Sequence, residues 1–243
     1  MKRVAVLLYG IASYLVFLAT FLYAIGFVGN LWVPKSIDSA PVSPLSQALL
    51  VDAALLALFA LQHSVMARPA FKRWVTRFIP VAAERSTFVL AASLALALLF
   101  WQWQPLGGLV WSVEAPALRV ALHALCALGW TLVLASTVLI DHFDLFGLRQ
   151  SWFAFRGEPY RAPAFVTPMP YRLVRHPLYF GFIVAFWATP TMTVSHLVFA
   201  VATTLYILVA IRFEEHDLAA AHPEYAEYRL RVPMLLPGMR RLG

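Results

Sequence analysis

The chain has 243 residues, of which 61% are hydrophobic and only 13% are charged, and its mean hydropathy is +0.74. Soluble domains are about 45–50% apolar and about 25% charged, so this composition excludes an ordinary soluble domain and a disordered chain. The formal net charge is +7, and the single cysteine, Cys126, permits no internal disulfide. The chain is therefore predicted to be an integral membrane protein.

Five long apolar stretches are predicted to cross the membrane, and a sixth is expected near the end of the chain. A helical span needs about 20 mostly apolar residues. The first four fall at residues 4–29, 45–66, 86–103 and 118–140, and the last two lie between residues 178 and 213, divided near Thr189-Pro190-Thr191. We interpret that last region as a helical hairpin, with one kinked span as the alternative. The predicted fold class is an all-α, polytopic membrane protein with five to six transmembrane helices and one domain over residues 1–243.

Basic residues gather on alternate sides of successive spans. They precede the first span and occupy the second-to-third loop, the fourth-to-fifth loop and the tail: Lys2, Arg3, Arg68, Lys72, Arg73, Arg77, Arg85, Arg149, Arg156, Arg161, Arg172, Arg175, Arg212, Arg229, Arg231, Arg240 and Arg241. Of the 19 basic residues, only Lys35 and Arg119 fall elsewhere. Positive charge favours the cytoplasmic side, so we expect an even number of spans, with both termini in the cytoplasm of a bacterial inner membrane. The charge also favours contact with anionic lipid, and we do not expect nucleic-acid binding.

The longest loop on that side begins with two carboxylates and an imidazole, in Asp141-His142-Phe143-Asp144. Ionisable groups at the mouth of a span are costly near hydrocarbon, which favours a functional role. The alternative is that they lie just outside the bilayer, where they cap the helix end or pair with Arg149.

The segment before the hairpin places charge at a helix start. Pro177 suits a first helical turn because its φ is fixed and it lacks an N–H. Arg175 and His176 then lie beside a helix N-terminus, which attracts anions such as a carboxylate or phosphate. The alternative is that both side chains only extend to the interface. Gly181, one turn later, permits close approach of another helix or a ligand.

The last apolar helix is followed by two adjacent glutamates, Glu214 and Glu215. The dipole at that end of a helix disfavours anions, so we expect compensation by Arg172, by Arg175 or by a cationic ligand. The alternative is a solvated helix end. The tail from Glu224 to Arg229 is predicted to be an interfacial helix, followed by an extended segment.

Together these motifs resemble a known family. Those of the C-terminal half are Arg175-His176-Pro177-X-Tyr179-X-Gly181, Glu214-Glu215, Pro223-X-Tyr225-X-X-Tyr228 and Val232-Pro233. In this order they resemble the signature of the isoprenylcysteine carboxyl methyltransferase-like membrane methyltransferases. The earlier motifs are Gln62-His63-Ser64-Val65-Met66-Ala67-Arg68, Glu84-Arg85-Ser86, Phe100-Trp101-Gln102-Trp103, the run from His142 to Gln150, and Trp187-Ala188-Thr189-Pro190-Thr191-Met192-Thr193. They narrow the resemblance to the methanethiol S-methyltransferases, which make dimethyl sulfide. His222-Pro223 departs from the broad family, in which many members have Phe-Gly.

The resemblance implies S-adenosylmethionine as the methyl donor, bound on the cytoplasmic side between the last two helices and the tail, roughly within residues 141–243. It implies cofactor-binding roles for Arg175, His176, Tyr179, Gly181, Glu214 and Glu215. Physically, Arg175 suits the methionine carboxylate, and the two glutamates suit the ammonium or the ribose hydroxyls. Tyr179 is expected to contact the adenine or face the sulfonium.

Methylation of a thiol also needs a group that removes its proton, because the thiolate is the nucleophile. The resemblance does not identify this base. The candidates are His142 with Asp144, whose carboxylate would raise the basicity of the imidazole, and His63; Arg85 would stabilise a thiolate. For His63 the alternative is a hydrogen-bonded interior histidine.

The expected partners are a small thiol, methanethiol, and membrane lipid, with no obligatory protein partner. No metal site is expected, because the seven histidines show no ligand spacing. Alternative functions are methylation of another thiol, a prenyl-cysteine carboxylate or a lipid. A transporter, or a non-catalytic accessory protein of nitrogen-oxide metabolism, is the alternative from another class.

Overall fold

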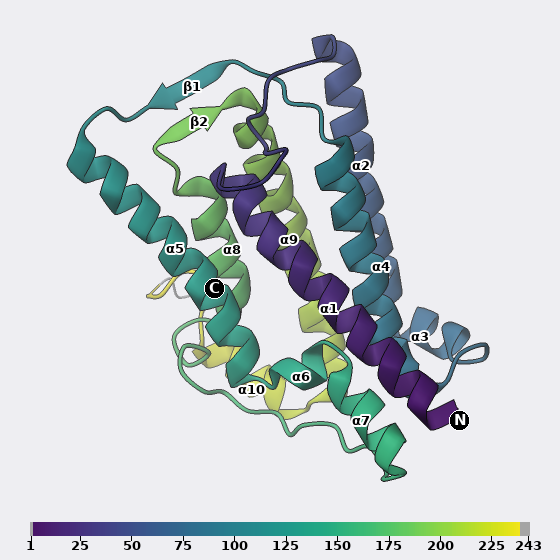
Figure 1. Ribbon diagram of the computed structural model, residues 1–243. Coiled ribbons are helices and arrows are strands. Elements are labelled where there is room, and N and C mark those ends of the chain that lie inside the picture. Colours follow the sequence, from purple (N-terminus) through teal and green to yellow (C-terminus); the bar gives the residue numbers. More distant parts are fainter. Residues whose placement is uncertain (1, 239–243) are drawn as a thin grey trace. The chain divides into compact units, whose positions relative to one another are not determined.

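The computed structural model describes residues 2–238, so Arg240 and Arg241 of the basic tail lie outside the described residues. Within that range five helices are long and apolar enough to cross a membrane (Figure 1). They are α1 (Lys2–Gly29), α2 (Leu45–Ala67), α4 (Val81–Gln102), α5 (Pro116–Leu139) and α9 (Val194–Ala221). The shorter helices are α3 (Pro69–Val75), α6 (His142–Leu145), α7 (Leu148–Arg156), α8 (Pro177–Trp187) and α10 (Glu224–Arg231). The prediction of an all-α polytopic membrane protein is confirmed.

The chain forms two compact units. The first unit contains the described residues up to Gly108 together with Asp141–Pro163, and the second contains Leu109–Ile140 and the described residues from Ala164 onward. The region expected to bind the cofactor, residues 141–243, is therefore divided between them. A single domain over residues 1–243 stays a prediction.

In the first unit, α4 packs against both α1 and α2, and α7 packs against α1 and α4 (Figure 1). Small side chains make the contact with α7 close. The hydroxyls of Ser86 and Ser151 both donate to the carbonyl of Gly147, over 3.3 and 3.0 Å. Gly147 has a φ of +86°, and a Cβ there would lie 2.7 Å from the backbone nitrogen of Ser86. Only glycine fits this position, which holds the α6–α7 segment against α4.

In the second unit, α8 packs against α5 and α9 (Figure 1). The contact with α5 depends on two glycines. A Cβ on Gly129 would lie 2.8 Å from the carbonyl oxygen of Gly181, and a Cβ on Gly181 would lie 2.8 Å from that of Gly129. The two backbones therefore touch directly, as small residues permit at helix contacts in membranes.

Two short strands, which the sequence did not predict, close one end of the second unit. Strand β1 (Leu109–Ser112) pairs antiparallel with β2 (Thr191–Thr193), placing Leu109 opposite Thr193 and Ser112 opposite Thr191. The backbone N–H of Val113 donates to Pro190 O over 2.8 Å. This pairing joins the start of α5 to the link between α8 and α9. Strands of four and three residues are too short to leave a periodic pattern in the sequence.

The hairpin near Thr189 is present, but its first arm is not a full-length span. Helix α8 has 11 residues, which at about 1.5 Å per residue is about half of the bilayer core of about 30 Å. The α-helix ends at Trp187, and the chain continues through the extended residues that contain β2. The first arm of the hairpin is therefore a short apolar helix followed by non-helical chain, and five helices of the described residues are long enough to cross a membrane.

Two helix boundaries also differ from the sequence expectation and move candidate residues into helices. Helix α4 begins at Val81 because the extended backbone of Pro80, with ψ 138°, ends the preceding turn. Arg85 therefore lies in the first turns of a helix, not in a loop. Helix α9 continues beyond Phe213 to Ala221, so Glu214 and Glu215 lie within it. The helix expected from Glu224 is present as α10, and its position at the membrane interface stays a prediction.

Candidate functional site

The start of α8 positions the first two candidate residues of the second unit. Pro177 occupies the first helical position, and His176 is the residue before it, with φ −125° and ψ 62°. The φ lies in the range expected before proline, and the ψ lies outside the α-helical region, so the helix cannot extend back through His176. This conformation places Arg175 and His176 at the helix start, where they are buried. The sequence prediction of a charged helix start at this point is confirmed.

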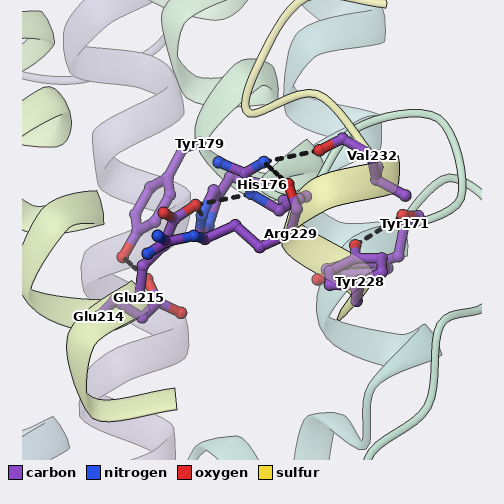
Figure 2. Close-up of polar contacts among 9 residues, drawn as sticks. Tyr171, His176, Tyr179, Glu214, Glu215, Tyr228, Arg229 and Val232 are labelled. Atoms are coloured by element: carbon purple, nitrogen blue, oxygen red, sulfur yellow. Dashed lines mark hydrogen bonds and ion pairs between the residues drawn. The ribbon is translucent and has the colours of Figure 1, made fainter. Parts of the chain in front are cut away.

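Arg175, His176 and Glu215 form a buried hydrogen-bonded cluster (Figure 2). Arg175 Nε donates to Glu215 Oε1 over 2.7 Å, and His176 Nε2 lies 3.0 Å from the same oxygen. All three residues are at most 6% exposed. The expected compensation of the glutamates by a nearby cation is confirmed for Glu215 and Arg175. Arg172 instead donates its Nε to the carbonyl of Thr167.

The same guanidinium holds the C-terminal segment (Figure 2). Arg175 Nη1 donates to Arg229 O over 3.0 Å and to Val232 O over 2.6 Å. The backbone N–H groups of Arg175 and His176 donate to Pro233 O and Met234 O over 2.9 and 3.1 Å. Four hydrogen bonds from two adjacent residues thus fix the tail after α10 on the start of α8. The sequence did not reveal this contact, because the acceptors are backbone carbonyls.

Glu214 has a different partner. Tyr179 donates its hydroxyl to Glu214 Oε2 over 2.7 Å, and Figure 2 shows the two side chains meeting beside the Glu215 cluster. Tyr179 also packs against the buried Ile207, Ile211 and Leu235. Since Oε2 accepts this bond, Oε1 is the oxygen that Glu214 can offer to a ligand.

Three further tyrosines surround these residues, and the sequence motifs, which include two of them, did not predict a role for any of the three in the site. Tyr228 donates to Tyr171 O over 2.7 Å, and Tyr171 donates to Ser136 O over 3.4 Å. Burial raises the pKa of Tyr228 to about 12, against the opposing effect of Arg175. Burial and then the charge of Glu215 raise the pKa of Tyr225. The signal in the sequence was the spacing of Tyr225 and Tyr228, which puts both on one face of α10.

The Tyr225 hydroxyl has an unusual environment. Tyr225 is 2% exposed, and its hydroxyl makes no hydrogen bond of ordinary geometry with a described residue, although a longer contact with the Glu215 carboxylate contributes to the raised pKa of Tyr225. A buried hydroxyl without a partner costs about 1–3 kcal/mol, and such groups in native proteins commonly face a ligand or water. The hydroxyl lies close enough to Glu215 and Arg175 for their charges to act on it.

Gly181 has a packing role in this structure. Besides Gly129 O, a Cβ at this position would lie 3.0 Å from Val133 N. The residue therefore sets the distance between α8 and α5. Its place in the cofactor pocket stays a prediction.

The first unit brings together the four residues predicted for catalysis. His142 is half-buried, and its Nε2 lies 2.9 Å from the hydroxyl of Tyr14. Burial lowers the pKa of His142, which favours the neutral imidazole at neutral pH. The rings of Phe17 and Phe146, stacked with centroids 3.8 Å apart, flank this pair. Tyr14 was missed because it lies within a uniformly apolar span.

Asp144 does not pair with His142 among the described residues. It accepts hydrogen bonds from Tyr160 over 2.7 Å and from Gln150 over 3.3 Å. Burial and the bond to Asp144 raise the pKa of Tyr160 to about 12. The sequence expectation that Asp144 raises the basicity of His142 therefore finds no support in the geometry: Asp144 orders the chain after α7, and burial acts on His142 in the opposite direction.

The remaining acid of this loop, Asp141, forms an ion pair with Arg149 and accepts from the backbone N–H of Asp144. This is the capping and pairing arrangement that the sequence left open as the alternative to a functional role. It holds the α6 turn in place.

Arg85 and His63 complete the group. Arg85 Nε donates to Leu145 O over 2.6 Å, and its guanidinium carbon lies 5.0 Å from the centre of the Phe88 ring. The His63 ring packs on the same Phe88 ring, with centroids 4.9 Å apart. Arg85 thus anchors the α6 turn that carries His142. The Phe88 ring, which contacts both Arg85 and His63, connects these two residues.

Within the described residues, no group of three or more His, Cys, Asp or Glu side chains could hold a metal ion. The polar side chains of the second unit could instead bind an organic ligand through hydrogen bonds and charge. They combine a guanidinium, two carboxylates, an imidazole and phenolic hydroxyls in a largely buried setting.

Comparison with known proteins identifies the family. The chain is 57% identical to the methanethiol S-methyltransferase of Mycobacterium tuberculosis, over 99% of both chains. It is 56% identical to methanethiol S-methyltransferase 2 of Bradyrhizobium diazoefficiens, over 97% of this chain and 91% of that protein. It is 55% identical to the methanethiol S-methyltransferase of Crocosphaera subtropica, over 98% of this chain and 93% of that protein.

A family model described as phospholipid methyltransferase matches residues 118–223. No solved structure is significantly similar to the chain. Since more than half of its residues are identical to those of the three relatives over nearly the whole length, the chain belongs to the methanethiol S-methyltransferase family of membrane methyltransferases.

Proposed function

We propose that the protein methylates a small volatile thiol, converting methanethiol to dimethyl sulfide with S-adenosylmethionine as the donor. The observation that carries this proposal is the identity of 57% to a relative of that name over 99% of the chain. The membrane setting agrees with it. A small apolar thiol partitions into lipid, so a membrane enzyme receives it from the bilayer and returns the more apolar thioether to it.

The polar groups of the second unit fit the proposed donor, which when bound supplies a methyl group on a positively charged sulfur. Three of the five N–H groups of Arg175 are used by protein acceptors, which leaves Nη2 for a carboxylate. Glu214 Oε1 suits an ammonium or a ribose hydroxyl. The buried Tyr225 hydroxyl, which makes only a long contact with Glu215, suits a further polar group.

These contacts refine the roles expected from the sequence. Glu215 and His176 act through Arg175: they fix its guanidinium, and Arg175 fixes the segment from Arg229 to Met234. We therefore assign Glu215 and His176 to holding the site, and Glu214 with Tyr179 to contacting the donor. The tail then excludes water from the bound methyl group, which methyl transfer requires.

For the thiol, we propose that His142 takes up the proton. Its lowered pKa keeps the imidazole neutral near neutral pH, and the Tyr14 hydroxyl fixes the ring. Arg85 holds the α6 turn through Leu145 and favours a thiolate by its charge. His63 and Asp144 are assigned supporting roles, His63 beside Phe88 and Asp144 in the bond to Tyr160.

Headspace gas chromatography tests the proposal. The purified, detergent-solubilised chain is given S-adenosylmethionine and methanethiol, beside Glu214→Gln as the site variant. Glu214 is preferable to Glu215 for this purpose, because loss of Glu215 would also disturb the buried cluster. We expect dimethyl sulfide from the parent and a rate at least about ten-fold lower from the variant. Donor binding by calorimetry without any product would refute the thiol as substrate.

The description of the matching family model favours a second candidate, methylation of a phospholipid amine. The same assay distinguishes it when phosphatidylethanolamine replaces methanethiol and the lipid products are analysed. Methylated lipid without dimethyl sulfide would select this second candidate. A prenyl-cysteine acceptor is tested in the same format. Absence of both donor binding and product would favour a non-catalytic membrane protein.

We also propose that the chain lies in a bacterial inner membrane with both termini and the site on the cytoplasmic side. The alternation of basic loops supports this orientation. Cysteine accessibility measures it: single cysteines at exposed positions such as Arg161 should react with a membrane-impermeant reagent only after the cells are opened. Reaction in intact cells would reverse the orientation.

A further inference from the structure

The connector between α2 and α4 is expected at the membrane surface, because it joins the ends of two helices that are predicted to span the membrane. Helix α2 ends at Ala67 and α4 begins at Val81, and both are long enough to cross the bilayer. The connector, residues 68–80, contains α3 and a turn in which Phe78 N and Ile79 N both donate to Val75 O, over 2.9 and 3.1 Å. The connector therefore has defined turns, and we expect the two flanking spans to hold it at the level of the lipid headgroups.

Three aromatic side chains form a ladder along this connector. The rings of Phe71 and Trp74 have centroids 5.3 Å apart, and those of Trp74 and Phe78 are 5.4 Å apart. Trp74 is 52% exposed and Phe78 72% exposed, although both are large apolar side chains. Exposed aromatic rings at a span end are typical of the membrane–water interface, where the ring lies among headgroups.

The connector is also strongly basic. It carries Arg68, Lys72, Arg73 and Arg77 and no acidic residue. Arg73 and Arg77 are exposed, and neither forms an ion pair with any described residue. They are four residues apart, and each directly precedes one of the exposed aromatic residues, Trp74 and Phe78. Exposed aromatic rings beside exposed cations that form no ion pair with a described residue make a surface that is complementary to an anionic membrane interface.

We propose that residues 68–80 form a docking surface for anionic phospholipid headgroups. The guanidinium groups of Arg73 and Arg77 bind the headgroup phosphates, and Trp74 and Phe78 insert between the headgroups and the acyl chains. The proposal does not depend on the methyl-transfer reaction. It gives this short connector a role in fixing the depth and lipid surroundings of the first unit.

Native mass spectrometry in detergent tests the headgroup preference. The purified chain is offered equimolar phosphatidylglycerol and phosphatidylcholine with identical acyl chains. We expect the parent to retain more phosphatidylglycerol, and Arg73→Gln/Arg77→Gln to lower that preference by at least about five-fold. The matched control, Arg156→Gln/Arg161→Gln, removes two exposed cations elsewhere in the first unit and should keep the parental preference. An unchanged preference in the first variant, or an equal loss in the control, would overturn the proposal.

Fluorescence quenching tests whether the aromatic side chains of the connector insert into the lipid. The chain is reconstituted in phosphatidylcholine–phosphatidylglycerol vesicles containing lipids brominated at shallow or deep positions of the acyl chain. The quenching that is lost in Trp74→Phe belongs to Trp74, and we expect it to be stronger for the shallow label. Quenching of Trp74 by neither lipid would show that another molecule covers this face, and would overturn lipid docking even if the charge variants behave as expected.

Discussion

The guanidinium of Arg175 lies against the carboxylate of Glu215, with Nε 2.7 Å from Oε1 and each residue only 6% exposed. Arg175 lies two residues before the start of α8 and Glu215 lies near the end of α9, so this pair joins the two arms of the hairpin. Arg175 also donates hydrogen bonds to Arg229 O and Val232 O, so the same guanidinium holds the C-terminal tail. One buried ion pair thus connects three segments that surround the proposed donor site.

Replacing Glu215 by glutamine should destabilise the protein, because it leaves the Arg175 charge buried without a counter-ion. We expect a loss of about 3 kcal/mol in the free energy of unfolding, measured by denaturant titration in detergent. The control is Glu227→Gln, which removes the exposed pair with Arg231 and should cost less than about 1 kcal/mol. Equal stability of the two variants would contradict a central role for the buried pair.

Gly181→Ala should also destabilise the fold, because its Cβ would meet the α5 backbone at 2.8–3.0 Å and push the two helices apart. Overpacking of this kind costs about 1–3 kcal/mol. Gly29→Ala is the matched control, since the Cβ there would meet only the flexible end of Leu31 at 3.2 Å. The unfolding midpoint and donor affinity are measured together. A variant with parental stability and lost donor affinity would instead place Gly181 in the cofactor pocket.

Glu214→Gln should weaken binding of S-adenosylmethionine about ten-fold, because a neutral amide offers a weaker acceptor to an ammonium or hydroxyl. Isothermal titration calorimetry measures the dissociation constant. Glu224→Gln, at the exposed start of α10, removes the same charge away from the site and should bind as the parent does. Parental affinity in Glu214→Gln would remove this residue from the donor site.

The pH dependence of kcat/KM should reflect the protonation of His142. Burial lowers its pKa below the usual 6.5, so the neutral base persists in more acidic solution, and the acid limb of kcat/KM should fall below pH 6.5. His142→Gln should abolish that limb and lower the rate, and Tyr14→Phe should move it. A pH profile of His142→Gln that matches the parent would exclude this residue as the base.

The same shift has a consequence for stability. Because the unfolded chain binds a proton at His142 at higher pH than the folded chain does, the free energy of unfolding should fall as pH drops below 6.5. His142→Gln should lack this component. Parallel pH profiles of unfolding for the two proteins would show that His142 is not shielded in the folded state.

The sequence by itself determined that this is a polytopic membrane protein and where its long helices lie, because the length of an apolar run is a local property set by the thickness of the bilayer. It also identified Arg175, His176 and Glu215 as a group, through motif order. It could not show that their hydrogen bonds reach the carbonyls of Arg229 and Val232, since backbone acceptors leave no trace in residue identity.

Other features were decided only by the tertiary structure, because they depend on contacts between residues far apart in the chain. The contact of Gly129 with Gly181 determines how closely α5 and α8 pack. His142 meets Tyr14, 128 residues away, whereas its sequence neighbour Asp144 bonds Tyr160. In the sequence, α8 is part of one long apolar run. In the structure the helix ends at Trp187, and the pairing of β2 with β1 supplies backbone hydrogen bonds beyond that end. Hydrophobicity fixes where the chain enters the membrane, and side-chain complementarity between distant segments fixes which polar groups meet there.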